Sequence, residues 1–521
     1  MGKKLLCFIM AVCFALSLVG CGGTQKIAMD SSDRADSTLK AGFVAETADY
    51  VYFINGAENY ATEYTTGSVT KGALMRVKKS EFADLETANY ETVVSKLLVA
   101  DDTKAGFYIY GDYVYYAVPS TEKDKTGALK NDQLNFFSTK LDATGTSSNI
   151  AGRDFPHSAQ YRFIKSGEEV YLVVFSTELY VYNAKTCKEV YTTEAKKDAK
   201  KVDKVDVAEV LFADNAVYFT SLPVNQDLSD EDGVQKHAFH NVYKIDLGAT
   251  VSANVVINGA GTTFGGKAGL LGVTVDLLRT HNSKLYFSYT EINTVTGASS
   301  VYVAVEESKL TADKAKTWMT DNAPITKNKH TVTAYADTSI FYGDLVYYVD
   351  ATYGLVCYDA SKVADTVNTD LGVTVVKYSE VLKNATLCFV NVEGEDTYMY
   401  FRDSSNNYYK VNLNGESEEL RLNTFAVNAT WYMPEVIKVG DAYYFVCSYS
   451  DSKFGSYVYA INTTKLAEEY AKLSDEDKEG FYTERPEDEE ENEEVLVRAE
   501  DFSVLLGQKS EADLEKEESN A

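Results

Sequence analysis

The chain has few residues of the types that common catalytic and metal-binding sites require. Its 521 residues include 5 histidines, 7 cysteines, 6 prolines and 2 tryptophans. So few prolines, together with 32 glycines, argue against extended low-complexity disorder. A nucleophile elbow of the form Gly-x-Ser-x-Gly, a phosphate-binding loop and a dinucleotide fingerprint are all missing. No motif therefore assigns a reaction or a catalytic residue, and we expect no cofactor.

Two of the scarce histidines lie close together. His237 and His240 are three residues apart, beside acidic residues, a spacing that occurs among zinc ligands. A third ligand at a defined spacing is missing, so they are weak candidates and we predict no metal site. The neighbouring stretch from Asp227 to Gly233 resembles part of a calcium loop, but the register that places Gly233 correctly puts Leu228 and Phe239 at ligand positions. We interpret it as an exposed loop.

Basic residues are outnumbered, and the excess of acid is concentrated at one end. The formal net charge is −28, and residues 466–521 contain 21 acidic and 6 basic side chains. A protein with this balance is not expected to bind nucleic acid through a general electrostatic field. We predict an acidic C-terminal tail over residues 466–521, partly helical or disordered, with a solvated run from Glu484 to Glu491. Residues 495–506 are apolar enough to dock on the rest of the chain.

The most abundant aromatic residue, tyrosine, marks a repeat. Each copy is a polar turn, an apolar-Tyr-aromatic strand, a loop and a second strand that commonly ends in Asp or Asn, as in Gly343-Asp344-Leu345-Val346-Tyr347-Tyr348 followed by Leu355 to Asp359. The repeat tyrosines are Tyr52, Tyr115, Tyr171, Tyr218, Tyr286, Tyr347, Tyr400 and Tyr444. Their mean spacing of 56 residues exceeds the roughly 40 to 50 residues of common propeller blades, so we expect long loops.

Copy four shows four short strands, at residues 210–212, 217–220, 242–246 and 255–257. A repeated four-stranded sheet is typical of a β-propeller, in which neighbouring blades cover both faces of each sheet. We therefore predict an all-β fold, a β-propeller over residues 47–465 with eight blades of four antiparallel strands. Seven blades is the alternative, because copies one and five are the weakest. Phe43-Val44-Ala45 is a candidate for a strand that completes the last blade.

The N-terminus carries a second pattern. A basic leader, Lys3-Lys4, precedes the apolar run at residues 5–19, which is too short for a comfortable membrane span and ends in Leu18-Val19-Gly20-Cys21. This motif resembles the bacterial lipoprotein signal. The resemblance implies a signal peptide at residues 1–20, cleavage between Gly20 and Cys21, and a diacylglycerol and palmitate-type lipid anchor on Cys21. A plain secretory peptide with an incidental cysteine is the alternative.

The residues after Cys21 bear on how the body is attached. Residues 21–46 are small and polar, and we predict a flexible tether there, part of which pairs as an edge strand in the alternative interpretation. Gly22 follows the cysteine in place of the Asp that retains some lipoproteins on an inner membrane. The expected location is the extracellular face of a cytoplasmic membrane, with an outer membrane as the alternative. Cys187, Cys357, Cys388 and Cys447 lie mostly in strand-like runs, so we predict no disulfide framework.

The tyrosine repeat and the N-terminal motif together resemble surface lipoproteins of Firmicutes that carry tandem Tyr-rich propeller repeats. The body is also broadly similar to propellers of the Tyr-Trp-Thr-Asp class, although that tetrapeptide and the Asp-box of sialidase-type propellers are missing. The resemblance implies a membrane-anchored, repeat-containing cell-surface binding protein and brings no active site with it.

Three functions stay open at this point. The first is a non-catalytic platform that binds a protein, peptide or glycan on its loops, of which residues 222–241 and 290–300 are the longest. The second is an extracellular carbohydrate-active enzyme, which needs a pair of carboxylates. The third is an envelope assembly factor that recruits partners through the acidic tail. Deletion of residues 466–521 is expected to leave binding or hydrolysis by the propeller intact.

Overall fold

The computed structural model describes most of the chain between the N-terminal pattern and the last residue. The described residues are 26–29, 35–57, 69–99, 106–130, 132–194, 205–213, 216–221, 224–230, 233–248, 250–258, 270–310, 338–359, 374–415, 418–424, 433–451, 455–483 and 497–520. Cys21, the predicted signal peptide at residues 1–20 and the acidic run from Glu484 to Glu491 lie outside them. The helices of the described part are too short or too polar to cross a bilayer.

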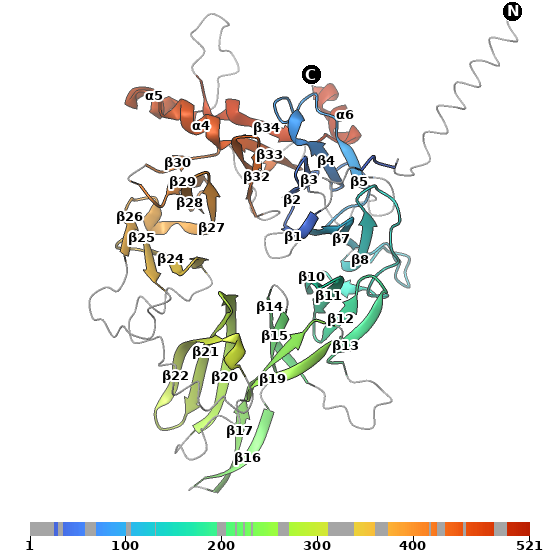
Figure 1. Cartoon of the computed structure of the whole chain (residues 1–521), viewed down its shortest axis with the longest axis vertical. Helices are drawn as coiled ribbons and strands as arrows, with labels where there is room; N and C mark the ends of the chain where they lie inside the picture. The colour runs from blue at the N-terminus through green and yellow to red at the C-terminus, as the bar shows by residue number, and fades with distance from the viewer. Residues whose placement is uncertain are drawn as a thin grey trace, which may run out of the picture. The chain divides into compact units, whose positions relative to one another are not determined.

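Eight β-sheets make up the fold, and each contains one copy of the tyrosine repeat. We number them blades 1 to 8 in the order of their repeat tyrosines. In each blade the predicted partner strand pairs with the tyrosine strand, as Leu345–Asp350 (β24) pairs with Gly354–Asp359 (β25) in blade 6. The predicted all-β, eight-bladed propeller fold is confirmed. The seven-bladed alternative is wrong, because copies one and five have sheets of their own (Figure 1).

The chain divides into two compact units, of which unit 1 comprises Met1–His157 and Phe425–Ala521. Unit 1 holds blades 1, 2 and 8. Their strands are β2 (Val44–Glu46), β3 (Tyr50–Ile54), β4 (Leu74–Lys78) and β5 (Glu91–Val94) in blade 1; β1 (Ala35–Ala41), β6 (Phe107–Gly111), β7 (Tyr113–Pro119), β8 (Gln133–Lys140) and β9 (Phe155–Pro156) in blade 2; and β31 (Glu435–Val439), β32 (Ala442–Asp451), β33 (Gly455–Asn462) and β34 (Ser503–Leu506) in blade 8.

Unit 2, Ser158–Thr424, holds blades 3 to 7. The strands of blades 3 and 4 are β10 (Gln160–Ser166), β11 (Glu169–Phe175), β12 (Leu179–Asn183), β13 (Lys188–Thr192), β14 (Val207–Phe212), β15 (Ala216–Ser221), β18 (Asn241–Asp246) and β19 (Ser252–Asn258). Those of blades 5 to 7 are β16 (Val224–Asp230), β17 (Gly233–Phe239), β20 (Leu270–His281), β21 (Lys284–Asn293), β22 (Gly297–Glu306), β23 (Ile340–Tyr342), β24, β25, β26 (Thr374–Lys377), β27 (Thr386–Glu393), β28 (Asp396–Arg402), β29 (Tyr408–Asn412) and β30 (Leu420–Arg421).

The tyrosine strands are buried on both faces. In blade 4, Val217, Tyr218 and Phe219 are all fully buried although successive side chains of a strand point to opposite faces. The same holds for Val51, Tyr52 and Phe53 in blade 1. Burial on both sides explains why these strands are continuously apolar instead of alternating. Burial also raises the pKa of several of these tyrosines, including that of Tyr347 to about 12.

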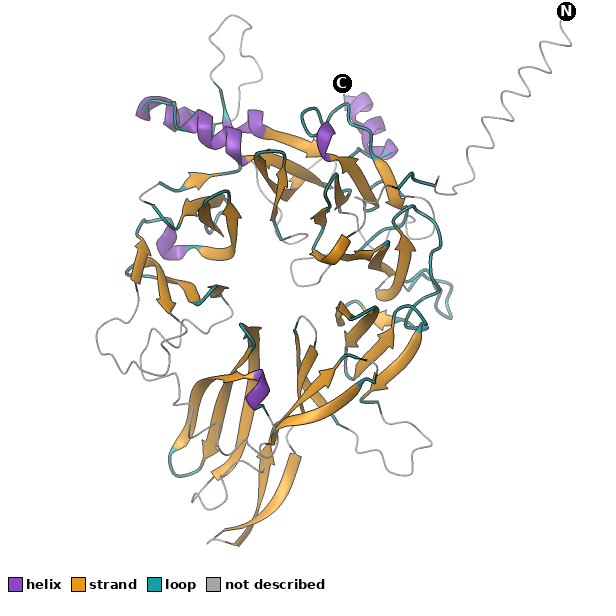
Figure 2. Cartoon of the chain, viewed as in Figure 1, coloured by secondary structure: helices purple, strands orange, loops and turns teal. Residues whose placement is uncertain are grey.

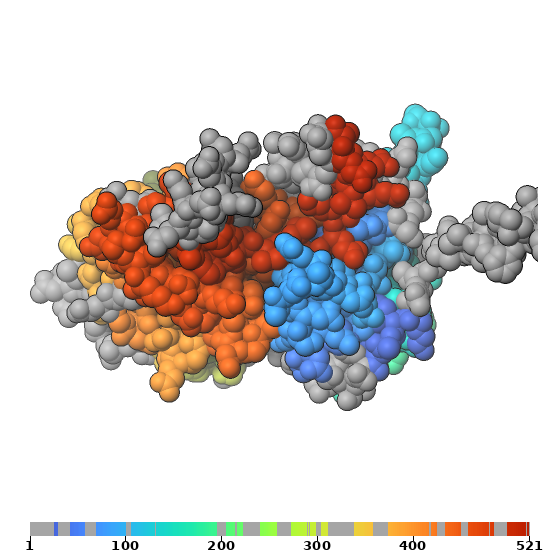
Figure 3. Space-filling model, turned by 90° about the horizontal axis from the view of Figure 1, so that it is seen from above, coloured from blue at the N-terminus to red at the C-terminus, as the bar shows by residue number. Residues whose placement is uncertain are grey.

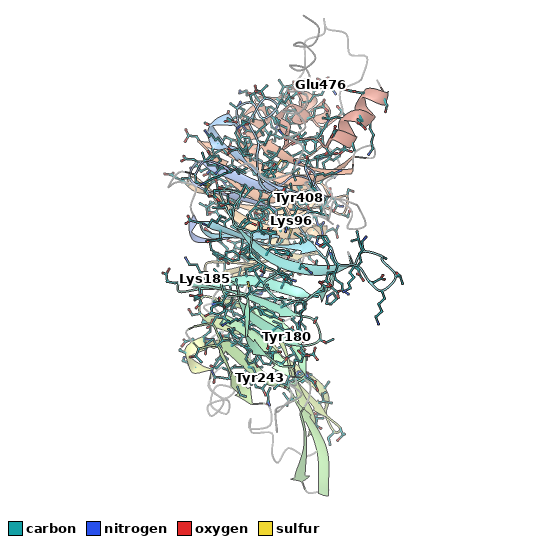
Figure 4. The ribbon with its side chains drawn as sticks, turned by 90° about the vertical axis from the view of Figure 1, so that its right-hand side faces the viewer. Lys96, Tyr180, Lys185, Tyr243, Tyr408 and Glu476 are labelled. Atoms are coloured by element: carbon teal, nitrogen blue, oxygen red, sulfur yellow. The ribbon has the colours of Figure 1, made fainter. Side chains whose placement is uncertain are left out.

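Stacked aromatic pairs recur between the tyrosine strand and its partner strand, at the residue that follows the repeat tyrosine. Phe219 of β15 stacks on Tyr243 of β18 with ring centroids 4.8 Å apart, and Phe401 of β28 stacks on Tyr409 of β29 at 5.3 Å. Both are directly opposite pairs in their ladders. Figure 4 labels Tyr243 among the side chains of unit 2. A stacked cross-strand pair stabilises by about 0.5 to 1.5 kcal/mol, so the second aromatic of the triplet fixes strand pairing as well as burial.

The Asp or Asn at the end of the partner strand closes the turn that follows. Asn183 Oδ1 accepts hydrogen bonds from the backbone of Lys185 and Thr186, and Asp142 Oδ1 accepts one from Thr144 N. In blade 8 the equivalent Asn462 accepts from Lys465 N and caps the helix α4 (Thr463–Tyr470). Short polar side chains favour such local bonds to the backbone, which accounts for this part of the repeat.

The two segments predicted as long loops form β-hairpins. Residues 222–241 contain β16 and β17, so the interpretation of Asp227 to Gly233 as an exposed loop is wrong for its described backbone. Strand β17 pairs in parallel with β20, which makes blade 5 five-stranded and partly parallel. Residues 290–300 continue β21 into β22, whose ladder runs to Asn293 opposite Gly297. The polar composition of these segments predicted loops. However, the hydrogen bonds between strands satisfy the backbone N–H and C=O groups of a polar strand as well as those of an apolar one.

Residues 43–45 do not complete the last blade. Val44 and Ala45 belong to β2, which pairs with β3 as the first strand of blade 1. The preceding segment, predicted within the tether, includes β1, which pairs with β6 in blade 2. The edge-strand alternative therefore describes Ala35–Ala41.

The C-terminal segment supplies the fourth strand of blade 8. Strand β34 pairs with β33, Val458 lying opposite Leu506 and Ile461 opposite Ser503. The helices α4, α5 (Asp475–Gly480) and α6 (Glu511–Asn520) also belong to this segment (Figure 2). The boundary predicted at residue 465 thus cuts through a sheet. Deletion of residues 466–521 removes a strand from the propeller and does not test the tail alone.

The first and last blades are joined within unit 1 by a fully buried amide. Asn55 Nδ2 donates to Thr70 O at 3.0 Å and to Gln508 O at 2.7 Å, and Asn55 Oδ1 accepts from Gln508 N at 3.0 Å. Beside it, Gly42 N donates to Glu435 Oε1 and Lys438 N donates to Glu46 Oε1. Figure 3 shows the residues of blade 1, in blue, against the C-terminal residues, in red.

Gly507→Ala is expected to destabilise unit 1 by about 3 kcal/mol. Gly507 has φ +117°, and a Cβ there would lie 2.0 Å from Asn55 Oδ1 and 2.9 Å from Phe53 Cε2. The measurement is the midpoint of urea unfolding followed by a probe in blade 8. Gly440→Ala is the matched control, because Gly440 has φ +61° in the β31–β32 turn and open space around it, so only the backbone cost of about 1 kcal/mol is expected. Equal losses in the two variants would contradict the close contact with Asn55.

Candidate functional site

A hollow of about 420 Å³ lies in unit 2, where β20 of blade 5, β23 of blade 6 and β27 of blade 7 meet. Its volume falls in the range of small-ligand sites, about 300 to 1,000 Å³. The lining residues come from β20, β23 and β27 and the residue before β23; they are Arg279, Thr280, His281, Ser339, Ile340, Phe341, Tyr342, Cys388, Phe389 and Val390. The hollow is therefore built from consecutive repeats.

The polar turns of the repeat hold two sides of the hollow together. Asn282, with φ 47°, donates from Nδ2 to Gly343 O at 3.1 Å and to Asp344 Oδ1 at 3.2 Å. His281 Nε2 lies 2.6 Å from the same Gly343 carbonyl. A carbonyl oxygen only accepts, so Nε2 is the protonated ring nitrogen. The turns that the sequence identified as strand connections thus also align blade 5 with blade 6.

Phe341 is the centre of the aromatic wall. The Arg279 guanidinium lies 4.3 Å from its ring centroid, and the rings of His281 and Tyr286 approach it edge-on at 5.1 Å each. Arg279 Nη1 donates to Ser339 O at 3.0 Å. A cation over an aromatic face gains about 0.5 to 2 kcal/mol. The cationic group is consequently held in place at the wall of the hollow, which is also lined by Tyr342, a residue that is 39% exposed.

The same contact occurs between blades 3 and 4. Arg162 Nη1 donates to Phe212 O at 3.3 Å, and its guanidinium lies 5.4 Å from the Phe212 ring. Part of the role of Arg279 is therefore to pack blade 5 against blade 6, as Arg162 packs blade 3 against blade 4. What distinguishes Arg279 is the hollow, with His281 and the exposed Tyr342 on its wall.

The groups that line the hollow are mainly aromatic, apolar and cationic. Among the described residues that line it, none is acidic, so it lacks the carboxylate pair of a glycosidase. Its thiol, Cys388, is nearly buried, and burial raises its pKa to about 11. A thiol with this pKa is protonated at neutral pH and is a poor nucleophile. Aromatic faces and a guanidinium remain, which suit a ligand with an apolar face and an anionic group.

Two nearly buried carboxylates elsewhere are fully engaged in structural contacts. Glu393 of β27 accepts hydrogen bonds from Tyr400 OH and from Lys410 Nζ, the latter at 2.7 Å. In unit 1, Asp513 accepts from Tyr457 OH and Ser510 Oγ, both at 2.6 Å, and lies 3.7 Å from Lys71 Nζ. The Asp513 cluster docks α6 beside a polar hollow of about 290 Å³. Each carboxylate holds packed elements together within its own unit.

Of the two weak metal candidates, only His240 has a side chain within the described part of the chain. His240 Nδ1 lies 3.2 Å from Val275 N, which donates to it, so β20 occupies this ring nitrogen. The side chain of His237, on β17, lies outside the described part, as do Gly20 and Cys21. Within the described residues, no cluster of three or more His, Cys, Asp or Glu side chains is placed to hold a metal ion. Cys187, Cys357, Cys388 and Cys447 are free thiols.

Sequence reasoning did not identify the hollow. The available signal was the placement of cationic and aromatic residues directly before two polar turns, at Arg279 to His281 and at Phe341-Tyr342. The distance between these segments in the chain hides their proximity.

No protein-family model matches this chain, and no curated protein does. Solved structures with some similarity include a chain of a mitotic checkpoint complex, at 9% identity and a TM-score of 0.30, covering 67% of this chain and 86% of that one. Another is a post-proline cleaving enzyme from Rickettsia typhi, at 9% identity and a TM-score of 0.33, where the match covers 82% of this chain and 52% of the enzyme. Neither similarity is close enough to bear on function.

Cys388 is expected to resist alkylation in the folded protein. At pH 8 a thiol with a pKa of about 11 is ionised to about one part in a thousand, and burial blocks access further. Timed iodoacetamide labelling followed by peptide mass spectrometry measures this, with the partly exposed Cys187 as the internal control. Labelling of Cys388 as fast in buffer as in urea would show that the thiol is accessible and that the hollow has a reactive nucleophile.

Proposed function

We propose that this chain is a bacterial surface lipoprotein, attached to the outer face of the cell membrane through Cys21, whose propeller binds a ligand without catalysing a reaction. The observation that carries the binding role is the hollow of blades 5 to 7, which offers aromatic and cationic groups and, among its described lining residues, no carboxylate. The anchor rests on the sequence motif that ends at Cys21.

The hollow favours one class of ligand among the protein, peptide and glycan alternatives. Exposed tyrosine rings pack on the apolar faces of sugar rings and of peptide side chains, and Tyr342 is exposed at the wall. A positioned guanidinium pairs with a carboxylate or phosphate. The proposed ligand is therefore a glycan or peptide of the cell envelope that carries an anionic group. An enzyme of propeller fold and an envelope assembly factor remain the alternatives.

Cys21→Ser is expected to abolish attachment to the membrane. The serine oxygen cannot form the thioether on which the lipid is carried, so incorporation of labelled palmitate should fall to background and the protein should move to the soluble fraction. Cys187→Ser is the control and should keep both properties. Palmitate incorporation that persists in Cys21→Ser would overturn the anchor and would leave the binding role untouched.

Arg279→Met and Tyr342→Ala are each expected to lower ligand affinity at least tenfold. The probe is an array of anionic and neutral glycans and envelope peptides, applied to the lipid-free Cys21→Ser protein. Arg162→Met is the matched control, because it removes the same inter-blade contact away from the hollow. Equal losses in Arg162→Met and Arg279→Met would mean that packing alone was affected. Shortening of an array glycan in solution would favour the enzyme instead.

The assembly-factor alternative needs a test that spares blade 8. Residues 484–496 can be replaced by a neutral linker, because Ala499 N bonds Phe481 O at 2.9 Å and Arg498 Nη1 bonds Thr483 O at 3.2 Å across the ends of the segment. Binding by the hollow should survive this replacement. Loss of a partner only in the neutral-linker protein would assign that partner to the acidic segment.

A further inference from the structure

Residues 26–29, which begin five positions after the proposed lipid anchor, are docked on the blades of unit 1. Ile27 N donates to Asp142 O at 3.1 Å, and the Ile27 side chain is 6% exposed within the core formed by blades 1, 2 and 8. Lys26 Nζ lies 3.8 Å from Asp142 Oδ2. An apolar side chain buried in this way contributes stability that a mobile tether would not have. We call residues 26–29 the clamp segment.

A fully buried arginine holds the other end of the clamp segment. Arg76 of β4 donates from Nη2 to Ala28 O at 2.7 Å, and its Nη1 lies 3.3 Å from Met29 Sδ. Glu91 Oε2 lies 2.8 Å from Nη2, and the Tyr50 ring centroid lies 4.0 Å from the guanidinium. A buried guanidinium requires acceptors around its whole plane. The Ala28 carbonyl is one of them, so release of the segment would leave the charge with fewer partners.

The clamp segment limits how far the body can lie from the lipid. Lys26 lies five positions after Cys21, and an extended chain spans at most about 3.5 Å per residue, or about 18 Å. Without the clamp, the first attachment would be β1 at Ala35, fourteen residues from the cysteine, with a reach of about 50 Å.

We infer that the clamp segment holds the blade 1 and blade 2 side of unit 1 against the surface of the lipid bilayer. This inference rests on the proposed anchor at Cys21. It replaces the long tether expected over residues 21–46 with a short one, and it fixes which side of unit 1 faces the membrane.

A pair of insertions tests the inference. Ten Gly/Ser residues are placed between Thr24 and Gln25 in one protein and directly after Met29 in the other, and the height of the acylated protein above a supported bilayer is measured by neutron reflectometry. The first insertion lengthens the free tether from about 12 Å to about 21 Å in root-mean-square extent, so the body should rise by about 10 Å. The second lies beyond the clamp and should leave the height unchanged.

Two further variants test whether docking of Ile27 is what limits the height. Ile27→Asp changes no residue of β4 and should release the segment, so that the insertion after Met29 now raises the body as the first one does. Lys26→Gln removes only an ion pair of an exposed side chain and should behave as wild type. Equal rises for both insertions in the wild-type background would overturn the inference, and so would no rise for either, since direct adhesion would then set the height.

Failure of the anchor is distinguishable from failure of the clamp. Amide exchange of Ile27 in the soluble Cys21→Ser protein reports the clamp without any lipid. It should be slow, and Ile27→Asp should make the neighbouring amides of the segment exchange at the unprotected rate. Rapid exchange in the Cys21→Ser protein overturns the clamp whatever the state of the cysteine, whereas missing palmitate overturns only the anchor.

Discussion

Burial of both faces of every tyrosine strand is the constraint on which the rest of the structure depends. A sheet whose second strand reads Val-Tyr-Phe or Val-Tyr-Tyr cannot expose either side to water without losing the hydrophobic free energy of large aromatic side chains. Each blade therefore needs a neighbour, and the contacts between neighbours carry much of the specific chemistry. For example, Tyr171 OH of blade 3 donates a hydrogen bond to Gly248 O, which lies between β18 and β19 of blade 4.

The need to cover both faces of each blade also explains the contacts between blade 1 and blade 8 in unit 1. Blade 1 and blade 8 are the first and last sheets in sequence, and each needs cover for a face that no sequential neighbour supplies. The buried amide of Asn55 meets the backbone of Gln508, and β34 completes blade 8 from beyond an acidic segment. The fourth strand of blade 8 comes from residues whose composition predicted an acidic tail. The stability of blade 8 therefore depends on those residues.

The proposed binding site lies where the packing of neighbouring blades leaves a hollow. Arginine over an aromatic ring joins blades 3 and 4 in the same way as blades 5 and 6, yet only the second pair borders the hollow lined by Phe341 and Tyr342. The clamp segment differs from the hollow in that its composition predicted a flexible linker. In the structure it is docked, because Arg76 donates a hydrogen bond to its backbone. In the function that we propose, the clamp segment keeps the body near the membrane and the cationic, aromatic hollow binds an envelope ligand.

The sequence by itself determined the fold class and the position of the two central strands in each blade, because the aromatic triplets and polar turns are local patterns that repeat along the chain. It predicted eight blades with seven as the alternative, and the eight sheets decided between them. It also predicted that the four downstream cysteines form no disulfide framework, and the described thiols are free. Only the tertiary structure decided the rest. The hairpin of β16 and β17, the membership of β34 in blade 8, the docking of Ile27 and the meeting of Arg279, Phe341 and Cys388 all depend on partners far away in the chain. Such pairings leave no periodic trace in a single sequence, because a polar strand and a polar loop have the same composition until another strand supplies the hydrogen bonds.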